Sequence, residues 1–202
     1  MENQAPFEII GAPVTLYVAP VGTAFPAVDE DPAAPWALVG TSGDRNYSED
    51  GVTVQHSQTI AEFRAAGSTG PIKAFRKEEA LMLSMEMADL SLEQYKLTLN
   101  GNTVTAVAAG VGTAGTKKLG LSRGFSVQQY ALLARGVSPY GDAMAMQYEV
   151  PVAYPSGSPE VVFRKGEASM LAIEWTALED PDAAAEDERF GRVVAQTDVA
   201  ET

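Results

Sequence analysis

The chain has 202 residues, 46% of them hydrophobic, which suits one ordinary folded domain with a core of its own. Its 27 acidic residues against 14 basic ones give a net charge of −13, which excludes a general clamp on the nucleic-acid backbone or a binder of anionic membranes. With no cysteine and a single histidine, His56, the chain has no disulfide, thiolate zinc site or multi-histidine metal cluster.

The chain also lacks targeting and membrane signals. Its first residues, 1–8, have neither the basic start nor the apolar centre of a secretory signal. No stretch approaches the roughly 18 unbroken apolar residues of a membrane span. We therefore expect no membrane partner.

Short strands separated by loops are predicted for the first part of the chain. Residues 14–18 and 36–39 are strand candidates, and the proline-rich acidic stretch 22–35 between them predicts an exposed loop. Residues 47–54 predict a strand or a hairpin broken at Asp50-Gly51. The polar segment 55–70 predicts a long exposed loop or an extended hairpin, and segments of this kind are usually functional.

A strand followed by the clearest helix comes next. Residues 79–88 consist largely of helix formers, yet their bulky side chains alternate with small ones, which favours a strand. Residues 91–100 predict a helix, with Ser91 and Gln94 in a capping box and Asn100-Gly101 as the stop.

Further strands are predicted beyond the helix, at 103–107, 119–121, 127–134, 144–152 and 161–163. Their number and spacing indicate a mainly β fold, a β-sandwich or a barrel of antiparallel sheets, with one flanking α-helix near 91–100. We expect a single domain over residues 1–202. A weaker second helix is predicted between Asp180-Pro181 and Gly191.

An internal repeat is the most informative pattern in the sequence. Residues 75–90 align without a gap on residues 163–178, at an offset of 88 (163 − 75), with nine of sixteen positions identical. The copies are Phe75-Arg-Lys-Glu-Glu-Ala-Leu-Met-Leu-Ser-Met-Glu-Met-Ala-Asp-Leu90 and Phe163-Arg-Lys-Gly-Glu-Ala-Ser-Met-Leu-Ala-Ile-Glu-Trp-Thr-Ala-Leu178. The repeat predicts two related halves, each with a similar turn and strand.

Both repeated strands have one bulky face and one face of small residues with a carboxylate in register. The bulky face, with Leu83 and Ile173, predicts the core. The other face, with Glu86 and Glu174, predicts a smooth and mildly acidic wall that faces water or a neighbour.

No catalytic, cofactor or metal site is predicted. His56 lies in a polar segment that supplies no strained turn to hold a nucleophile, and the acidic runs 29–31 and 179–182 lack the ligand spacing of a calcium loop. Glu86 and Glu174 occupy like positions, whereas a glycosidase needs two carboxyls in different environments. The basic doublets Arg76-Lys77 and Arg164-Lys165 suit subunit contacts and surface solubility equally well.

Motifs spread over residues 36–191 resemble, in their order and spacing, the tail tube (major tail) proteins of long-tailed bacteriophages. They are Trp36-Ala-Leu-Val-Gly40, Tyr47-Ser-Glu-Asp-Gly-Val-Thr-Val54, Pro71-Ile-Lys-Ala-Phe-Arg-Lys-Glu-Glu-Ala80 with the strand into Asp89-Leu-Ser-Leu-Glu93, and Trp175-Thr-Ala-Leu-Glu-Asp-Pro-Asp182 with Arg189-Phe-Gly191.

The resemblance implies a structural virion protein, not an enzyme, that forms homohexameric rings stacked into a phage tail tube. Such a tube is assembled in the bacterial host cytoplasm, conducts double-stranded DNA without binding it specifically, and meets tape measure, terminator and distal tail proteins. On this sequence, segment 55–70 would make the contact between rings, through Gln55, His56, Arg64, Gly67 and Gly70. Residues 1–12 and 192–202 would be arms.

An acidic lumen would repel DNA, and the carboxylates Glu86 and Glu174 are therefore candidate lumen-facing residues. Glu149, on the polar face of 144–152, is a third. The nearest alternative is another ring-forming tail protein, either a tail terminator or the inner tube of a contractile system. An extracellular carbohydrate-binding β-sandwich is less well supported, because the chain has only two tryptophans.

Overall fold

An antiparallel eight-stranded sheet dominates the computed structural model, which describes residues 13–138 and 144–197. The strands follow the order β2-β1-β7-β8-β9-β4-β3, β10 pairs with β8, and β5 and β6 form a separate two-stranded sheet. The predicted fold class, mainly β with one helix, is therefore confirmed. The elements are β1 (Thr15–Ala19), β2 (Ala37–Leu38), β3 (Tyr47–Phe63), β4 (Lys73–Met87), α1 (Leu92–Leu99), β5 (Val104–Val107), β6 (Thr116–Leu119), β7 (Tyr130–Val137), β8 (Ala145–Pro155), β9 (Leu171–Ala177) and β10 (Arg192–Ala195).

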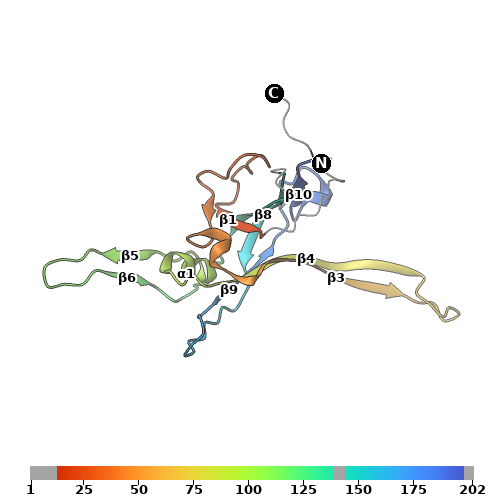
Figure 1. Ribbon diagram of the computed structural model, residues 1–202. Coiled ribbons are helices and arrows are strands. Elements are labelled where there is room, and N and C mark those ends of the chain that lie inside the picture. The colour runs from red at the N-terminus through yellow and green to blue at the C-terminus, as the bar shows by residue number, and fades with distance from the viewer. Residues whose placement is uncertain (1–12, 139–143, 198–202) are drawn as a thin grey trace, which may run out of the picture.

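Three segments project from a small body (Figure 1). The β3–β4 hairpin extends to one side and the β5–β6 hairpin, next to α1, to the other. The connection between β8 and β9 forms a third projection. The body itself holds β1, β7, β8, β9 and β10 together with the roots of the hairpins.

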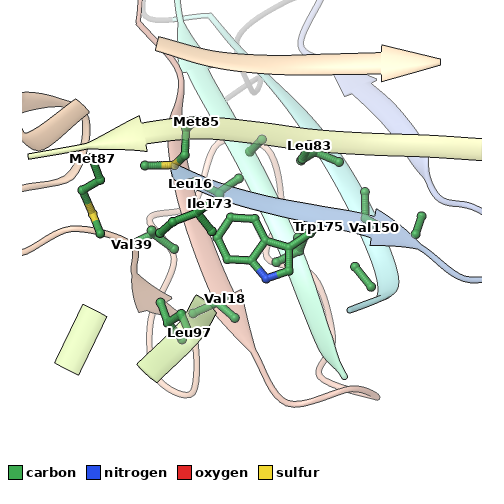
Figure 2. Close-up of a cluster of buried hydrophobic side chains, with 14 of the residues drawn as sticks. Leu16, Val18, Val39, Leu83, Met85, Met87, Leu97, Val150, Ile173 and Trp175 are labelled. Atoms are coloured by element: carbon green, nitrogen blue, oxygen red, sulfur yellow. The ribbon is translucent and has the colours of Figure 1, made fainter. Parts of the chain in front are cut away.

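The main core lies inside the curl of the large sheet. Leu16 on β1 and Leu83 on β4 belong to one buried cluster although β7, β8 and β9 separate their strands in the sheet, so the sheet curls around its own side chains. Trp175 is completely buried at the centre of this cluster (Figure 2). The predicted bulky faces of both repeated strands are buried here, which confirms the period-two pattern. They comprise Leu81, Leu83, Met85, Met87, Leu171, Ile173 and Trp175.

The opposite face of β1, β7 and β8 is covered by the proline-rich segment 20–36. Trp36 and Leu133 form a second buried cluster, with Phe25 packed against it. Both tryptophans of the chain are therefore buried, at 8% and 0% exposure, and neither offers the platform that a carbohydrate-binding surface needs. Strand β7 is consequently buried on both faces over most of its length.

Helix α1 coincides with the predicted helix, but its N-terminus is held differently. Neither Ser91 nor Gln94 makes a side-chain capping bond, so the predicted capping box is wrong. Instead, Asp89 accepts hydrogen bonds from the backbone N–H groups of Ser91 at 3.0 Å and Thr41 at 2.9 Å. Burial raises the pKa of Asp89, but the bonds from Thr41 and Ser91 outweigh it and hold that pKa below its ordinary value.

The predicted second helix is absent from the described residues 180–191. A short 3-10 turn, Glu186–Glu188, is the helical element there, because the segment has almost no apolar face to bury. Gly191 serves a different purpose from a helix stop. A Cβ at this position would lie 2.1 Å from the carbonyl oxygen of Glu149, so only glycine allows the backbones to approach this closely.

Several predicted boundaries are corrected by long-range pairing. Asp50-Gly51 does not end a strand but lies within an irregularity of register between Tyr47 and Val52 in β3. Residues 161–163 are not a strand. Strand β10 occupies 192–195, so the predicted C-terminal arm begins too early. The predicted arm 1–12, and residues 198–202 of the other arm, lie outside the described residues.

Candidate functional site

The two copies of the repeat lie side by side as neighbouring strands. Strands β4 and β9 pair antiparallel with Met85 opposite Ile173, and these two residues are equivalent in the repeat. The copies are thus related by a local two-fold axis through that pair. The register places Glu86 opposite Ala172 and Glu174 opposite Ser84, so the two carboxylates are diagonal neighbours on one face.

This face, which we call the β4–β9 wall, points away from the core. Glu86 is exposed and Glu174 is half-buried. Glu174 accepts a hydrogen bond from the hydroxyl of Ser156 at 3.0 Å, and Ser156 in turn accepts one from Thr176 at 2.8 Å. The predicted surface of small residues with carboxylates in register is therefore present, whereas its position in a lumen stays a prediction.

Glu149 does not belong to the wall, and the prediction that it lines an open surface is wrong. Its side chain is only 4% exposed and forms an ion pair with Arg192 at 2.7 Å. Gln147 also donates a hydrogen bond to it at 2.5 Å. The alternation along β8 is as predicted, because Glu149 points away from the main core. Segment 20–36 covers the face to which it points, while β10 pairs with the edge of β8 and places Arg192 beside it.

Glu149 is part of a polar network that fastens the acidic loop to the sheet. Arg135 donates to Gln147 at 2.9 Å and to the carbonyl oxygens of Ala27, at 2.8 Å, and Glu30. Burial lowers the pKa of Arg135, and neighbouring negative groups partly restore it. The hydrogen bond and charge of Glu149 raise the pKa of Arg192. This network has a structural role, because each charged side chain in it is hydrogen-bonded to another group of the fold.

Segment 55–70 is an extended hairpin, one of the two predicted forms. Gln55 and His56 lie in β3, while Arg64, Gly67 and Gly70 lie at or beside the turn before β4. All five are exposed or nearly so. Arg64 pairs with Glu62 at 2.7 Å on the surface. Their predicted role, a contact between rings, stays a prediction.

Large apolar side chains gather near the end of this hairpin, a feature that the sequence reading missed. Ile60, Phe63, Ile72 and Phe75 are each about half exposed. Since Ala61 is opposite Phe75 and Phe63 is opposite Lys73, the two phenylalanines are diagonal neighbours on one face. Phe63 lies inside the polar segment 55–70 and Phe75 follows it, and these two aromatic residues were the signal in the sequence that could have revealed the cluster.

The basic doublets of the repeat occupy different surroundings, contrary to the expected similarity. Arg76 and Lys77 lie within β4, and Arg76 binds Glu79 at 3.1 Å. Arg164 and Lys165 lie in the irregular segment before β9, where Arg164 binds Glu167 at 3.5 Å. The two copies therefore share the same structure only over their second halves, which form paired parts of β4 and β9. All four side chains are exposed, as a subunit contact or a solvated surface requires.

An open hollow lies beside the β3–β4 hairpin. His56, Arg76, Glu79 and Asp187 line an open hollow of about 380 Å³ at the root of the β3–β4 hairpin, beside Phe190. No group of three or more histidine, aspartate or glutamate side chains in the described part of the chain is placed to hold a metal ion. Among the same residues, no helix has the length and apolar character needed to cross a membrane.

Comparison with models of known protein families and with curated proteins finds no match to this chain. Its candidate site is therefore defined by its own surfaces: the β4–β9 wall and the projecting hairpins.

Proposed function

We propose that this protein is a structural subunit that assembles into hexameric rings, stacked as a phage tail tube through which double-stranded DNA passes. Its main partner is then another copy of itself, and other tail proteins bind the ends of the tube. The site of action is the virion, after assembly in the host cytoplasm. The proposal needs surfaces for self-assembly and a bore that does not hold DNA.

The observation that carries the proposal is the β3–β4 hairpin. It extends away from the body (Figure 1) and exposes Phe63 and Phe75 at 55% and 57%. Side chains of this size that stand on a projecting element, rather than singly on a body, are typical of a surface that a partner covers. A hairpin that reaches beyond its own subunit suits a contact with a neighbouring copy.

The outer edge of the sheet supports self-assembly independently. Strand β3 is the terminal strand of the sheet and runs for 17 residues, so its outer backbone groups face no strand among the described residues. Long free edges of this kind pair readily with another chain. Pairing between copies would extend the sheet around a ring.

The β4–β9 wall supports the conduit part of the proposal. It presents small side chains with Glu86 and Glu174 in register and has no basic residue between Ala80 and Ala88 or between Met170 and Ala177. A wall of this kind repels the phosphate backbone without offering donors that would hold it.

The test is electron microscopy of concentrated protein, with Phe63→Ser/Phe75→Ser as the decisive variant. We expect the wild type to form rings and tubes, and the variant to remain as single subunits with its melting temperature unchanged, since both side chains are solvated in the subunit. Val21→Ser, an exposed apolar residue on the body, is the matched control and should still assemble. Strictly monomeric wild-type protein would contradict the proposal, and rings that never stack would indicate a tail terminator.

A further inference from the structure

The β5–β6 arm, residues 102–127, is held to the rest of the chain near its base and along α1, and not by pairing with the large sheet. Its strands share only four register pairs, from Val104↔Leu119 to Val107↔Thr116. An isolated ribbon this short is marginal in water, and packing against another element stabilises such ribbons. Its base is closed by Asn100, whose side chain donates to Ser126 at 2.8 Å and accepts from Gln128 at 2.5 Å. Lys117 contacts Glu93 on α1, and the end of the arm extends beyond α1, away from the body (Figure 1).

The arm also exposes an unusual amount of apolar surface for an acidic protein. Five of its seven large apolar residues are more than half exposed, and two of these, Val111 and Phe125, are fully exposed, while Val104 and Leu119 are partly buried. The five exposed residues are Val107, Val111, Leu121, Phe125 and Val127. Apolar side chains gathered on one projecting ribbon indicate a surface that is covered in use.

The charge of the arm is opposite to that of the remainder of the chain. Residues 102–127 contain Lys117, Lys118 and Arg123 and no acidic residue. The rest of the chain therefore has 14 − 3 = 11 basic residues against all 27 acidic ones. Lys117 is paired with Glu93 of α1 at 2.5 Å, and Arg123 donates to the carbonyl of Gly157. Among the described residues, no carboxylate forms an ion pair with Lys118 or Arg123.

A complementary surface lies on the body, next to β10. A hollow of about 170 Å³ is lined by apolar Phe25, Pro151 and Ala183 and by the carboxylates of Asp180 and Asp182. No ion pair neutralises Asp180 or Asp182 among the described residues. Glu149, Glu188 and Arg192 also line the hollow, so it combines apolar side chains with a net negative charge, the complement of the arm.

We propose that the β5–β6 arm of one copy docks in the Phe25–Asp182 hollow of a second copy. From Val104 to Val111 the arm reaches about 25 Å at the usual rise of a strand. It leaves the body on the side away from β10, so the hollow that it fills belongs to another molecule (Figure 1). Two different patches meet, which makes the contact heterologous and able to close a ring or extend a filament. This inference rests on the proposed self-assembly and names one of its contacts.

The chain has no cysteine, so single introduced cysteines test the contact directly. Val111→Cys and Ala184→Cys proteins are mixed under assembly conditions, oxidised and separated on a non-reducing gel. Both positions are exposed in the subunit, so both variants should fold. We expect a mixed disulfide between the two variants. Ser42→Cys, an exposed position far from the hollow in sequence, replaces Ala184→Cys as the control and should give no more than background cross-linking.

Charge exchange gives a second readout. Lys118→Glu in the Val111→Cys protein should abolish the mixed disulfide, and Asp182→Lys in the Ala184→Cys protein should restore it. Arg45→Glu, an equal charge change at another exposed site, should leave cross-linking unchanged. Rings that form without the mixed disulfide would overturn this inference while leaving the proposed function intact. A mixed disulfide from protein that never forms rings would support this contact and contradict the proposed function.

Discussion

At the scale of single residues, Tyr47 shows how one polar side chain joins distant segments. Its hydroxyl donates to the carbonyl of Val39 at 2.8 Å and accepts from the backbone N–H of Leu16 at 3.1 Å. Three segments of the chain therefore meet at one phenol. Burial raises the pKa of Tyr47 to about 12, an effect that the hydrogen bond from Leu16 only partly opposes.

We predict that Tyr47→Phe lowers the free energy of unfolding by about 1–2 kcal/mol, because both backbone groups lose a partner. The raised pKa favours the neutral phenol in the folded state, so its contribution is complete below about pH 10 and is lost as the pH rises towards about 12. Urea denaturation across this window should show a steeper loss of stability for the wild type than for Tyr47→Phe. Equal slopes would mean that Tyr47 ionises normally in the folded protein.

At the scale of elements, a cross-strand ion pair joins β10 to β8. Arg192 and Glu149 are direct register partners, and the carboxylate is almost fully buried while the guanidinium remains half exposed. A carboxylate left in such a place without its cation loses its main compensation. The pair therefore stabilises β10 on the sheet, together with its four register pairs with β8.

Removal of this cation should be costly, and we expect Arg192→Ala to lower the free energy of unfolding by about 1–3 kcal/mol. The matched control is Arg64→Ala, which removes an arginine from an exposed pair with Glu62 and should change stability by less than about 0.5 kcal/mol. Chemical denaturation measures both. Similar losses in the two variants would show that burial of Glu149 has no energetic consequence.

At the scale of the whole molecule, negative and positive charges lie on different surfaces. The β4–β9 wall and the hollow beside β10 are acidic, whereas the β5–β6 arm is basic. In the proposed assembly, this division would let the basic arm of one copy attract the acidic hollow of another while the wall stays negative.

If the proposed tube forms with the β4–β9 wall in its lumen, reversal of the wall charge should make the lumen bind DNA. We predict that tubes of Glu86→Lys/Glu174→Lys protein retain linear double-stranded DNA in sedimentation, with retention that falls as salt rises. Wild-type tubes should retain none. Asp29→Lys/Asp31→Lys makes the same change of net charge on the exposed loop and should behave as the wild type inside the tube. Equal retention by both variants would place the wall outside the lumen.

Much of the fold could be predicted because the patterns that define it are local. The alternation of Leu83 and Met85 with Ser84 and Glu86 separates a core face from an outward face in any sheet. Helix α1 was predicted within a residue at each end. The β4–β9 wall followed from the same alternation and from the repeat.

Which segment covers an outward face depends on residues far away in the sequence, so the sequence alone did not predict which outward side chains are buried. Glu86 and Glu149 both point away from the main core, yet only Glu149 is covered, because segment 20–36 and β10 reach it through turns and pairings far along the chain. The two basic doublets have nearly identical sequences and different structures for the same reason: Arg76 has β3 as a pairing partner, whereas Arg164 has no paired strand. Periodicity determined which way each side chain points, and long-range packing decided which of them still meets solvent.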